Sequence, residues 1–436
     1  MNRYPIYKPS GVKWLGEIPS HWEIVPLKHV VTYNDEVLLE TENNNKHIKY
    51  VEIGDVDSVS GVKRYTEYAF KDAPSRARRI TRKGDVIVST VRTYLRAVAP
   101  IIDDDLIVST GFAVLRAKTI EKRFLAYYLM SDYFVGEVIR RSVGTSYPAI
   151  NANELVSISF VCPSLSEQSA IASYLDTATA KIDAAITQQQ KMIDLLNERK
   201  QIIINKAVTR GLNPNVKMKD SGVEWIGEVP EGWKIKKLKH LAKIFGRIGF
   251  RGYNASDLVD EGEGAITLSP SNMKEHKMQY EKCTYLSWNK YYESPEIMIK
   301  NGDVLFVKTG STYGKSCLVE NLPMEATINP QLVVFKEFNC SNSFFDYLLQ
   351  SNIIRDQVEL SVIGGTIPTI SQEKILNYLV PIPSLEEQLF IFDAINSSCK
   401  PLNEAIINAN KQISLLQERK QIIINEVVTG KVKICK

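Results

Sequence analysis

Basic residues gather in one stretch of each half of the chain, and such a concentration of charge suits contact with nucleic-acid phosphates. The stretch from Lys63 to Arg96 carries ten Lys or Arg residues against three acidic ones, and the stretch from Lys234 to Arg251 carries seven against none. A charge run can equally be a solvated face, and the net charge of the whole chain is only +4. The basic candidates for nucleic-acid contact are Arg76, Arg78, Arg79, Lys234, Lys236, Lys237, Lys239, Arg247 and Arg251.

A second pattern combines hydroxyls, a ring and a cation, which together suit phosphate contact and base-edge readout. The pattern of Thr90 to Arg96 aligns with that of Thr309 to Lys315 if one gap is allowed, and an exposed turn explains it equally well. Further on, 144–150 and 365–370 both place Gly-Thr before a proline, for which a fold-closing loop is slightly favoured. These patterns add the nucleic-acid-contact candidates Thr90, Arg92, Thr93, Tyr94, Arg96, Thr145, Lys308, Thr309, Thr312, Tyr313, Lys315 and Thr366.

Motifs for catalysis are missing from the sequence. The segment from Gly310 to Ser316 resembles a phosphate-binding loop, but three residues separate its glycines where the motif needs four. We find no Asn-Pro-Pro-Tyr-type methylase signature, no acidic nuclease cluster and no metal spacing among the histidines or the six cysteines. We therefore predict no catalytic residue, no metal and no cofactor in this chain.

The cellular location is predicted from three further absences. No signal peptide is visible at the start of the sequence. No apolar run approaches the ~18 residues that a membrane helix needs. Scattered cysteines without a CxxC pair fit a reducing compartment. We expect a cytoplasmic protein with no membrane partner.

The candidate residues belong to a unit that the chain contains twice. Ser10 to Pro19 returns as Ser221 to Pro230, Gly84-Asp85-Val86 returns as Gly302-Asp303-Val304, and Pro-Ser-Leu-x-Glu-Gln begins at both 163 and 383. Leu195 to Asn205 matches Leu415 to Asn425 at ten of eleven positions. The order is the same throughout, which establishes an internal duplication.

Each copy is predicted to consist of a head and a long helix. Short apolar runs opened by Gly-Asp turns indicate a small α+β head. Ser164 with Glu167, and Ser384 with Glu387, have the spacing of a capping box before about 45 residues with a heptad stripe. Pro401 is expected to break or kink the second helix. The apolar stripe comprises Ile182, Ile186, Ile193, Leu196 and Ile203 in one copy and Leu402, Ile406, Ile413, Leu416 and Ile423 in the other.

The predicted fold class is α+β. Two small mixed α/β heads are separated by two long antiparallel coiled-coil helices, with pseudo-two-fold symmetry between the copies. Helices packed only on their own heads are the alternative. The predicted domains are 1–163, 164–211, 212–383 and 384–436. Trp14, Trp22, Trp225 and Trp233 are expected to anchor the N-terminal segment of each head.

The ordered series of motifs resembles the specificity subunit of type I restriction-modification systems. The series runs from Trp-x-Gly-Glu-x-Pro through Gly-Asp-Val, Gly-Thr and Pro-Ser-Leu-x-Glu-Gln to a helix ending in Leu-Leu-x-Glu-Arg-Lys-Gln, twice. The resemblance covers essentially the whole chain. It implies a non-catalytic subunit whose two heads each read half of a split site in double-stranded DNA.

The resemblance also implies partners. Two methyltransferase subunits would dock on the helices, up to two restriction-translocase subunits would join, and S-adenosylmethionine, ATP and Mg²⁺ would bind those partners. Alternatives are a stand-alone two-headed DNA-binding regulator and the targeting chain of a bifunctional restriction enzyme outside type I. Polar residues identical near both helix ends are the partner-binding candidates: Glu198, Arg199, Lys200, Glu418, Arg419 and Lys420.

Overall fold

The computed structural model describes residues 3–57, 61–362 and 368–434. These form two compact units: unit 1 contains residues 1–191 and 409–436, and unit 2 contains residues 192–408. We call the part of unit 1 before its long helix the first head, and the part of unit 2 between the two long helices the second head. Each unit therefore holds one head, part of one long helix and part of the other.

The two long helices are α4 (Leu165–Arg210) and α9 (Leu385–Val428). The predicted capping box is present at the start of α4, where Glu167 N donates to Ser164 Oγ and Ser164 N donates to Glu167 Oε2. At the start of α9, Glu387 N donates to Ser384 Oγ. The helices thus begin where hydroxyl side chains satisfy backbone N–H groups that have no partner within the helix.

Of the break or kink predicted at Pro401, the break is wrong, because α9 continues through this residue. Proline removes one backbone hydrogen bond, to the carbonyl four residues earlier, which is that of Ser397. Pro401 and Ser397 are both exposed, so water can solvate the freed carbonyl. Cys399 and Ile395 are buried in the core of the second head and hold the same stretch in place. At 44 residues, α9 is about 66 Å long.

Within each unit the two helices run antiparallel. In unit 1, Glu167 and Gly430 both adjoin Trp22, and further along the pair Asp183 binds Lys420. In unit 2, Gly211 adjoins Glu387. The predicted antiparallel helices are confirmed within the units, and the predicted apolar stripe is buried or half-buried along its whole length.

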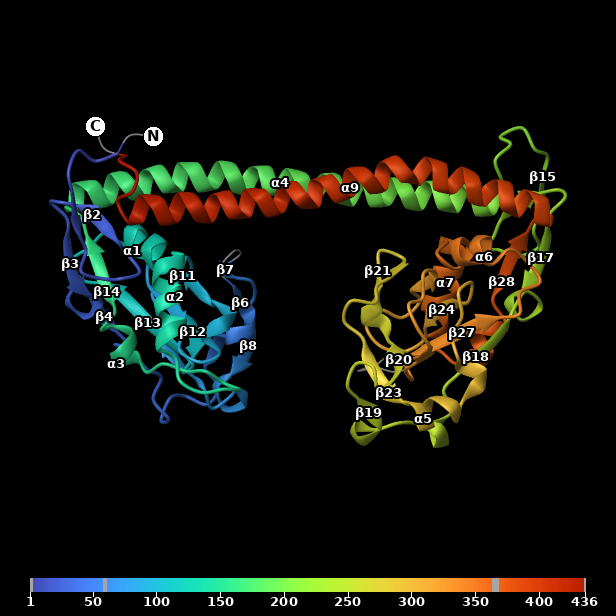
Figure 1. Ribbon diagram of the computed structural model, residues 1–436, viewed down its shortest axis with the longest axis horizontal. Helices are drawn as coiled ribbons and strands as arrows, with labels where there is room; N and C mark the ends of the chain where they lie inside the picture. Colours follow the sequence, from blue (N-terminus) through green and yellow to red (C-terminus); the bar gives the residue numbers. More distant parts are fainter. Residues whose placement is uncertain (1–2, 58–60, 363–367, 435–436) are drawn as a thin grey trace. The chain divides into compact units, whose positions relative to one another are not determined.

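Among its described residues, the first head contains two four-stranded sheets and three short α-helices, in addition to 3₁₀ turns (Figure 1). The inner sheet has the order β11 (Val98–Pro100), β10 (Val86–Ser89), β13 (Phe112–Ala117), β4 (Val31–Tyr33). The outer sheet has the order β8 (Thr66–Ala69), β5 (His47–Val51), β12 (Leu106–Ser109), β9 (Ala77–Ile80). The remaining elements are the pairs β1 (Tyr7–Pro9) with β2 (Glu17–Pro19), β3 (Glu23–Pro26) with β14 (Ser159–Cys162) and β6 (Val56–Asp57) with β7 (Gly61–Val62), and the helices α1 (Lys122–Leu129), α2 (Asp132–Arg141) and α3 (Ala152–Leu155).

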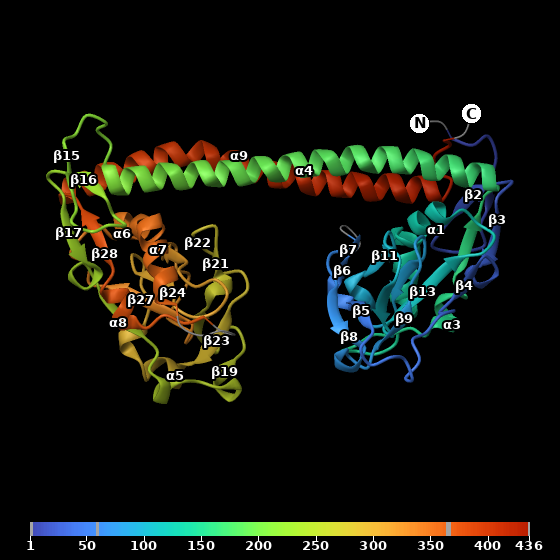
Figure 2. The same cartoon turned by 180° about the vertical axis from the view of Figure 1, so that it is seen from behind.

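The second head repeats this plan (Figure 2). Its inner sheet has the order β18 (Lys243–Gly246), β27 (Leu332–Lys336), β24 (Val304–Val307), β25 (Ser316–Leu318). Its outer sheet has the order β19 (Leu258–Val259), β23 (Thr284–Ser287), β20 (Gly264–Leu268), β26 (Ala326–Ile328). The remaining elements are the pairs β15 (Met218–Asp220) with β16 (Glu228–Pro230), β17 (Lys234–Lys237) with β28 (Leu379–Ile382) and β21 (Met273–Lys274) with β22 (Lys277–Met278), and the helices α5 (Trp288–Tyr292), α6 (Asn342–Leu349), α7 (Asn352–Ser361) and α8 (Gln372–Leu376).

Alternating side chains of each inner sheet serve two cores, as the two-residue period of a strand requires. In the first head, Val86 and Val88 pack with α1 and α2, whereas Ile87 packs with Val51 and Val108 of the outer sheet. In the second head, Val304 packs in the core beside the helices, and Val307 packs in the core between the two sheets. The heads are three-layered, with helices, inner sheet and outer sheet, which confirms the predicted mixed α/β class.

Candidate nucleic-acid interface

The identical ends of the long helices hold the heads in place. In unit 1, Gln421 Nε2 donates to the carbonyl of Met130 (3.2 Å), and Asn425 Oδ1 accepts the N–H of Asp132 (2.8 Å). That N–H belongs to the first turn of α2 and has no partner within the helix. The same contacts in unit 2 join Gln201 to Gln350 and Asn205 to Asn352. Part of the identity between the two helix ends is therefore explained inside the chain.

The repeated tryptophan and Glu-Gln motifs meet at the other helix ends. Trp22 Nε1 donates to Glu167 Oε1 (3.3 Å) and Trp233 Nε1 donates to Glu387 Oε2 (3.1 Å). Both rings are buried, as predicted for anchors. Trp14 stacks on Tyr133, but Trp225 is 48% exposed, so the prediction that it is an anchor of the same kind is wrong.

The loops that follow β10 and β24 have the same length in both heads. Ser89 N donates to the carbonyl of Ala97, and Val307 N donates to that of Lys315, so the loops match without a gap. The predicted one-gap alignment is therefore wrong. It aligned residues of similar type, whereas the backbone hydrogen bonds that close the loops fix which positions correspond. Both loops need positive φ at two positions, which are Arg92 (50°) and Arg96 (54°) in the first head and Gly310 (106°) and Gly314 (82°) in the second.

A cleft of about 570 Å³ opens beside this loop in the first head. The Arg92 guanidinium lies over the ring of Tyr147, 4.8 Å from its centroid, and Arg76 lines the same cleft from the segment before β9. Tyr50 and Ser109 contribute hydroxyls from the outer sheet, and burial raises the pKa of Tyr50. The cleft thus brings together two predicted DNA-contact residues, Arg76 and Arg92, and adds Tyr50 and Tyr147, which the sequence did not indicate.

The matched positions of the second head carry different side chains. The sheet registers place Thr267 where the first head has Tyr50, and Asn329 where it has Ser109. A 3₁₀ helix with a capping box follows β5 and β20 alike, beginning after Glu52 in the first head and after Ser269 in the second. Gly310 replaces Arg92. The same scaffold therefore presents two different sets of polar groups.

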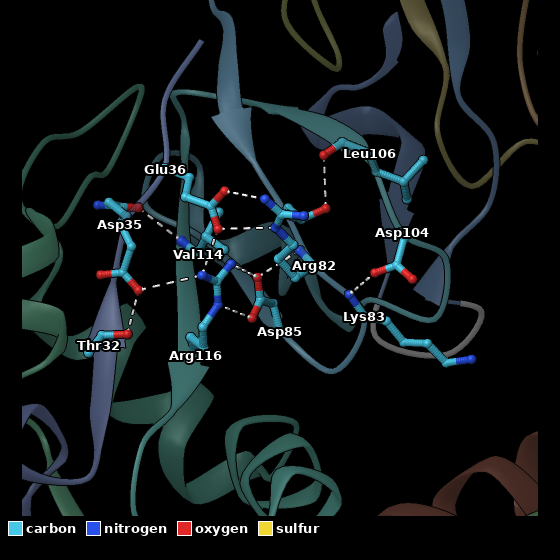
Figure 3. Close-up of polar contacts among 12 residues, drawn as sticks. Thr32, Asp35, Glu36, Arg82, Lys83, Asp85, Asp104, Leu106, Val114 and Arg116 are labelled. Carbon is cyan, nitrogen blue, oxygen red and sulfur yellow. Dashed lines mark hydrogen bonds and ion pairs between the residues drawn. The ribbon is translucent and has the colours of Figure 1, made fainter.

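Several charges in the basic stretch of the first head are neutralised within the head (Figure 3). Arg116 contacts both buried Asp85 and Glu36 at 2.8 Å, and Arg82 contacts Glu36 at 2.6 Å. Hydrogen bonds from Arg82 and Arg116 lower the pKa of Glu36 to about 2. Asp85 also accepts the N–H of Arg82, so the repeated Gly-Asp motif closes a turn. This network fixes the scaffold and leaves little of its charge for DNA.

The other candidates of the first head differ in their accessibility. Arg76 and Arg92 have no carboxylate at ion-pair distance among the described residues, and Arg78 lies over the Phe70 ring at 5.1 Å. Arg79 is half-buried, and burial lowers its pKa. Thr93 is buried against Ser142, Thr90 donates to the carbonyl of Gly111, and Arg96 pairs with Asp132. Tyr94 and Thr145 are exposed.

In the second head, the predicted basic stretch divides into an exposed part and a buried part. Lys234, Lys236 and Lys239 are exposed on and beside β17, and Lys237 donates to Asn377. Arg247 is buried and donates to the carbonyl of Ile328 and to Thr327, so its charge serves the fold. Arg251 pairs with Glu296.

The remaining candidates of the second head surround the loop after β24. Lys308 and Thr309 are half-buried, and burial lowers the pKa of Lys308. Thr312 is exposed, Tyr313 packs against the core and Lys315 donates to the carbonyl of Met273. Thr366 lies outside the described residues. Strand β25 follows this loop where a phosphate-binding loop needs a helix, which agrees with the rejection of that motif.

The basic stretches of the two heads lie at different places in the common scaffold. Arg78 and Arg79 belong to β9, an edge strand of the outer sheet that has no counterpart among the described strands of the second head. The lysines of the second head lie on β17, whose counterpart in the first head is β3 with Glu23, Ile24, Val25 and Pro26. The two stretches therefore do not form one repeated surface.

The predicted partner-binding residues lie on helix faces that also expose large apolar side chains. Leu195 is 65% exposed and Leu415 is 54% exposed. Ile202 and Ile422, which lie seven residues further along the same helix faces, are also exposed. The sequence did not indicate these residues, because they lie outside the heptad stripe that was predicted to be buried. Glu198, Arg199, Glu418 and Arg419 are exposed between them. Lys420 is instead held by Asp183 at 2.7 Å, and burial lowers the pKa of half-buried Lys200.

The profile of the type I restriction modification DNA specificity domain matches this chain twice, over residues 19–193 and 230–413. The chain belongs to this family. The two matches coincide with the two copies of head and helix, so the duplication is that of the specificity domain.

Individual relatives agree with this assignment. The MjaVIII type I restriction enzyme specificity subunit of Methanocaldococcus jannaschii is 26% identical over 67% of this chain and 66% of its own length. The putative MjaX specificity subunit of the same organism is 25% identical over 98% of both chains. A solved structure concerning complex assembly and conformational transition of the type I R-M system shares the fold, with a TM-score of 0.63 and 22% identity over 95% of this chain and 99% of that one.

No group of three or more His, Cys, Asp or Glu residues in the described part of the chain is placed to hold a metal ion. Within the same residues, no helix is both long enough and apolar enough to cross a membrane.

Proposed function

We propose that this specificity-family chain directs a type I restriction-modification complex to a split DNA site, and that each head reads one half-site. The observation that carries the proposal is the repeated scaffold with unlike polar groups at matched loop positions. The first head places arginine and tyrosine side chains around its cleft, whereas the matched positions of the second head are occupied by glycine, threonine and asparagine. Two copies of one scaffold with different polar groups are suited to reading two different half-sites.

The partners in this proposal are two methyltransferase subunits, to which up to two restriction-translocase subunits are added. The repeated exposed face of Leu195, Glu198, Arg199 and Ile202 recurs as Leu415, Glu418, Arg419 and Ile422. Apolar residues at such spacing lie on one side of a helix and suit a partner that buries them. Because the face occurs twice, two identical partners are expected.

The chemistry in this proposal resides on the partners. S-adenosylmethionine would serve the methyltransferase, and ATP with Mg²⁺ would serve the restriction-translocase. The sequence of this chain lacks the signatures of either activity. Highly pure chain, free of host methylases, is expected to show no turnover with S-adenosylmethionine or with ATP and Mg²⁺; turnover by the chain alone would contradict this.

The proposal is tested by assembling the chain with a methyltransferase subunit encoded beside it and mapping the methylated bases. We expect one split sequence to be methylated, and a complex mass that accounts for two methyltransferases. Replacing Leu195 and Ile202 with Ser should reduce the stoichiometry to one, as should replacing Leu415 and Ile422. Methylation at a continuous site would contradict the proposal. A chain that binds DNA alone, as a regulator does, and does not assemble with the methyltransferase would also contradict it.

A further inference from the structure

The backbone at Arg92 is in a conformation that favours glycine. Its φ of 50° and ψ of 46° place it in the left-handed region, where a side chain is disfavoured, and Gly310 occupies the matched position in the second head. The loop geometry alone would thus accept glycine. An arginine at this position is explained more simply by a use for its side chain than by the folding of the loop.

The Arg92 side chain is held but not neutralised. Its guanidinium carbon lies over the Tyr147 ring, 4.8 Å from the ring centroid, which restrains its position, and no carboxylate of the described residues pairs with it. Tyr147 is 65% exposed, so the pair lies at the mouth of the cleft. A guanidinium attracted to a ring face in this way still has N–H groups that can donate to a planar acceptor.

One group of the cleft, the Glu52 carboxylate, favours a base over a phosphate. Glu52 lines the cleft together with Arg76, Tyr50 and Ser109. A carboxylate would repel a phosphate, whereas it can accept from the amino groups of bases. Paired acceptors that match a guanidinium fork are presented in the major groove by guanine, through O6 and N7.

We propose that Arg92, positioned by Tyr147, is a specificity-determining residue of the first head and donates to O6 and N7 of one guanine in its half-site. This proposal rests on the proposed function. It goes further in assigning one base to one side chain, and it predicts that the second head, with Gly310, reads its half-site without this contact.

The experiment uses the full chain assembled with its methyltransferase, carrying Arg92→Gly, Arg92→Lys, Tyr147→Phe or no substitution. Binding is measured against DNA in which each base pair of the first half-site is varied in turn. Arg92→Gly should lower discrimination at one G·C pair by about 10- to 100-fold and leave the second half-site unchanged. Arg92→Lys should lose most of the same discrimination, because lysine lacks the fork, and Tyr147→Phe should retain it. Folding of Arg92→Gly should be intact, since glycine suits the backbone.

Two results would overturn the assignment. A uniform loss of affinity for all sequences, with a salt slope lower by about 1, would assign Arg92 to a phosphate. Unchanged discrimination would remove it from the interface. If the unsubstituted complex shows no split site, the proposed function fails instead, whatever the Arg92 variants do.

Discussion

The two heads agree wherever they meet the long helices and differ wherever their outer loops carry polar groups. Trp22 and Trp233, Gln421 and Gln201, and the Gly-Asp turns make the same contacts in both units. The positions of Arg92 and Gly310 share a backbone geometry but no side-chain chemistry. The comparison separates what a head needs to fold from what it can use to recognise DNA.

The largest effects should come from the shared anchors. Trp22→Ala or Trp233→Ala should cost about 3–5 kcal/mol of stability, because a large buried ring and its hydrogen bond to the helix are lost. Hydrogen exchange, followed separately for each unit, should show loss of protection in the unit that carries the substitution. Trp225→Ala is the control, since its ring is half-exposed and should matter by only about 0.5 kcal/mol. Equal effects of Trp225→Ala and Trp233→Ala would contradict the assignment of anchors.

A smaller effect should distinguish the second head from the first. Asp346 is buried on α6, where Ser316 and Gln350 donate to it at 2.8 Å, and burial raises its pKa to about 7. The matched residue of α1 is Ala126. Because the folded state binds this proton more tightly than the unfolded state does, unit 2 should lose stability as pH rises from about 4 to about 7.

The measurement is the pH dependence of unfolding of unit 2 with and without Asp346→Asn. The full shift corresponds to a few kcal/mol at most, at about 1.4 kcal/mol per pKa unit. The substitution should remove the fall between about pH 4 and 7 and leave unit 1 unchanged. An unaltered pH profile would show that Asp346 is not the group responsible.

The smallest effects should come from cations that are exposed or, like Arg78, half-buried. Arg76→Ala, Arg78→Ala, Lys236→Ala and Lys239→Ala should each lower the salt slope of DNA binding by about 1 if the side chain contacts a phosphate. Arg247→Ala is the contrasting variant, because its guanidinium is buried and bonded to the chain, and it should lower stability without changing the slope. Unchanged slopes in the exposed variants would remove those residues from the interface.

The helices could be predicted from the sequence because their signals are local. Capping hydroxyls, heptad spacing and terminal glycines each act within a few residues. The duplication then implied two heads of one fold. Pro401 misled the prediction because solvent exposure of the freed carbonyl, which the sequence does not show, decides whether a helix continues.

The candidate site was harder to predict because charge alone does not reveal a residue's partner. Arg247, Lys315 and Lys420 bind carbonyls or a carboxylate of the chain itself, although their spacing was that of DNA-contact or partner-binding residues. Tyr147 and Tyr50 belong to the cleft through tertiary contacts between distant segments. The predicted alignment of the two loops failed for a related reason. An arginine in the sequence does not indicate a positive φ, and the positive φ of Arg92 is recognised only when the structure aligns it with Gly310.

The central claim is that each head reads its own half-site, and an exchange of one head tests it most directly. Residues 10–160 would be replaced by the corresponding residues of another specificity-family chain, and the hybrid would be assembled with its methyltransferase. Mapping of methylated bases should then show one new half-site and one unchanged half-site. A hybrid that folds and methylates, but at a site altered in both halves, would contradict the claim.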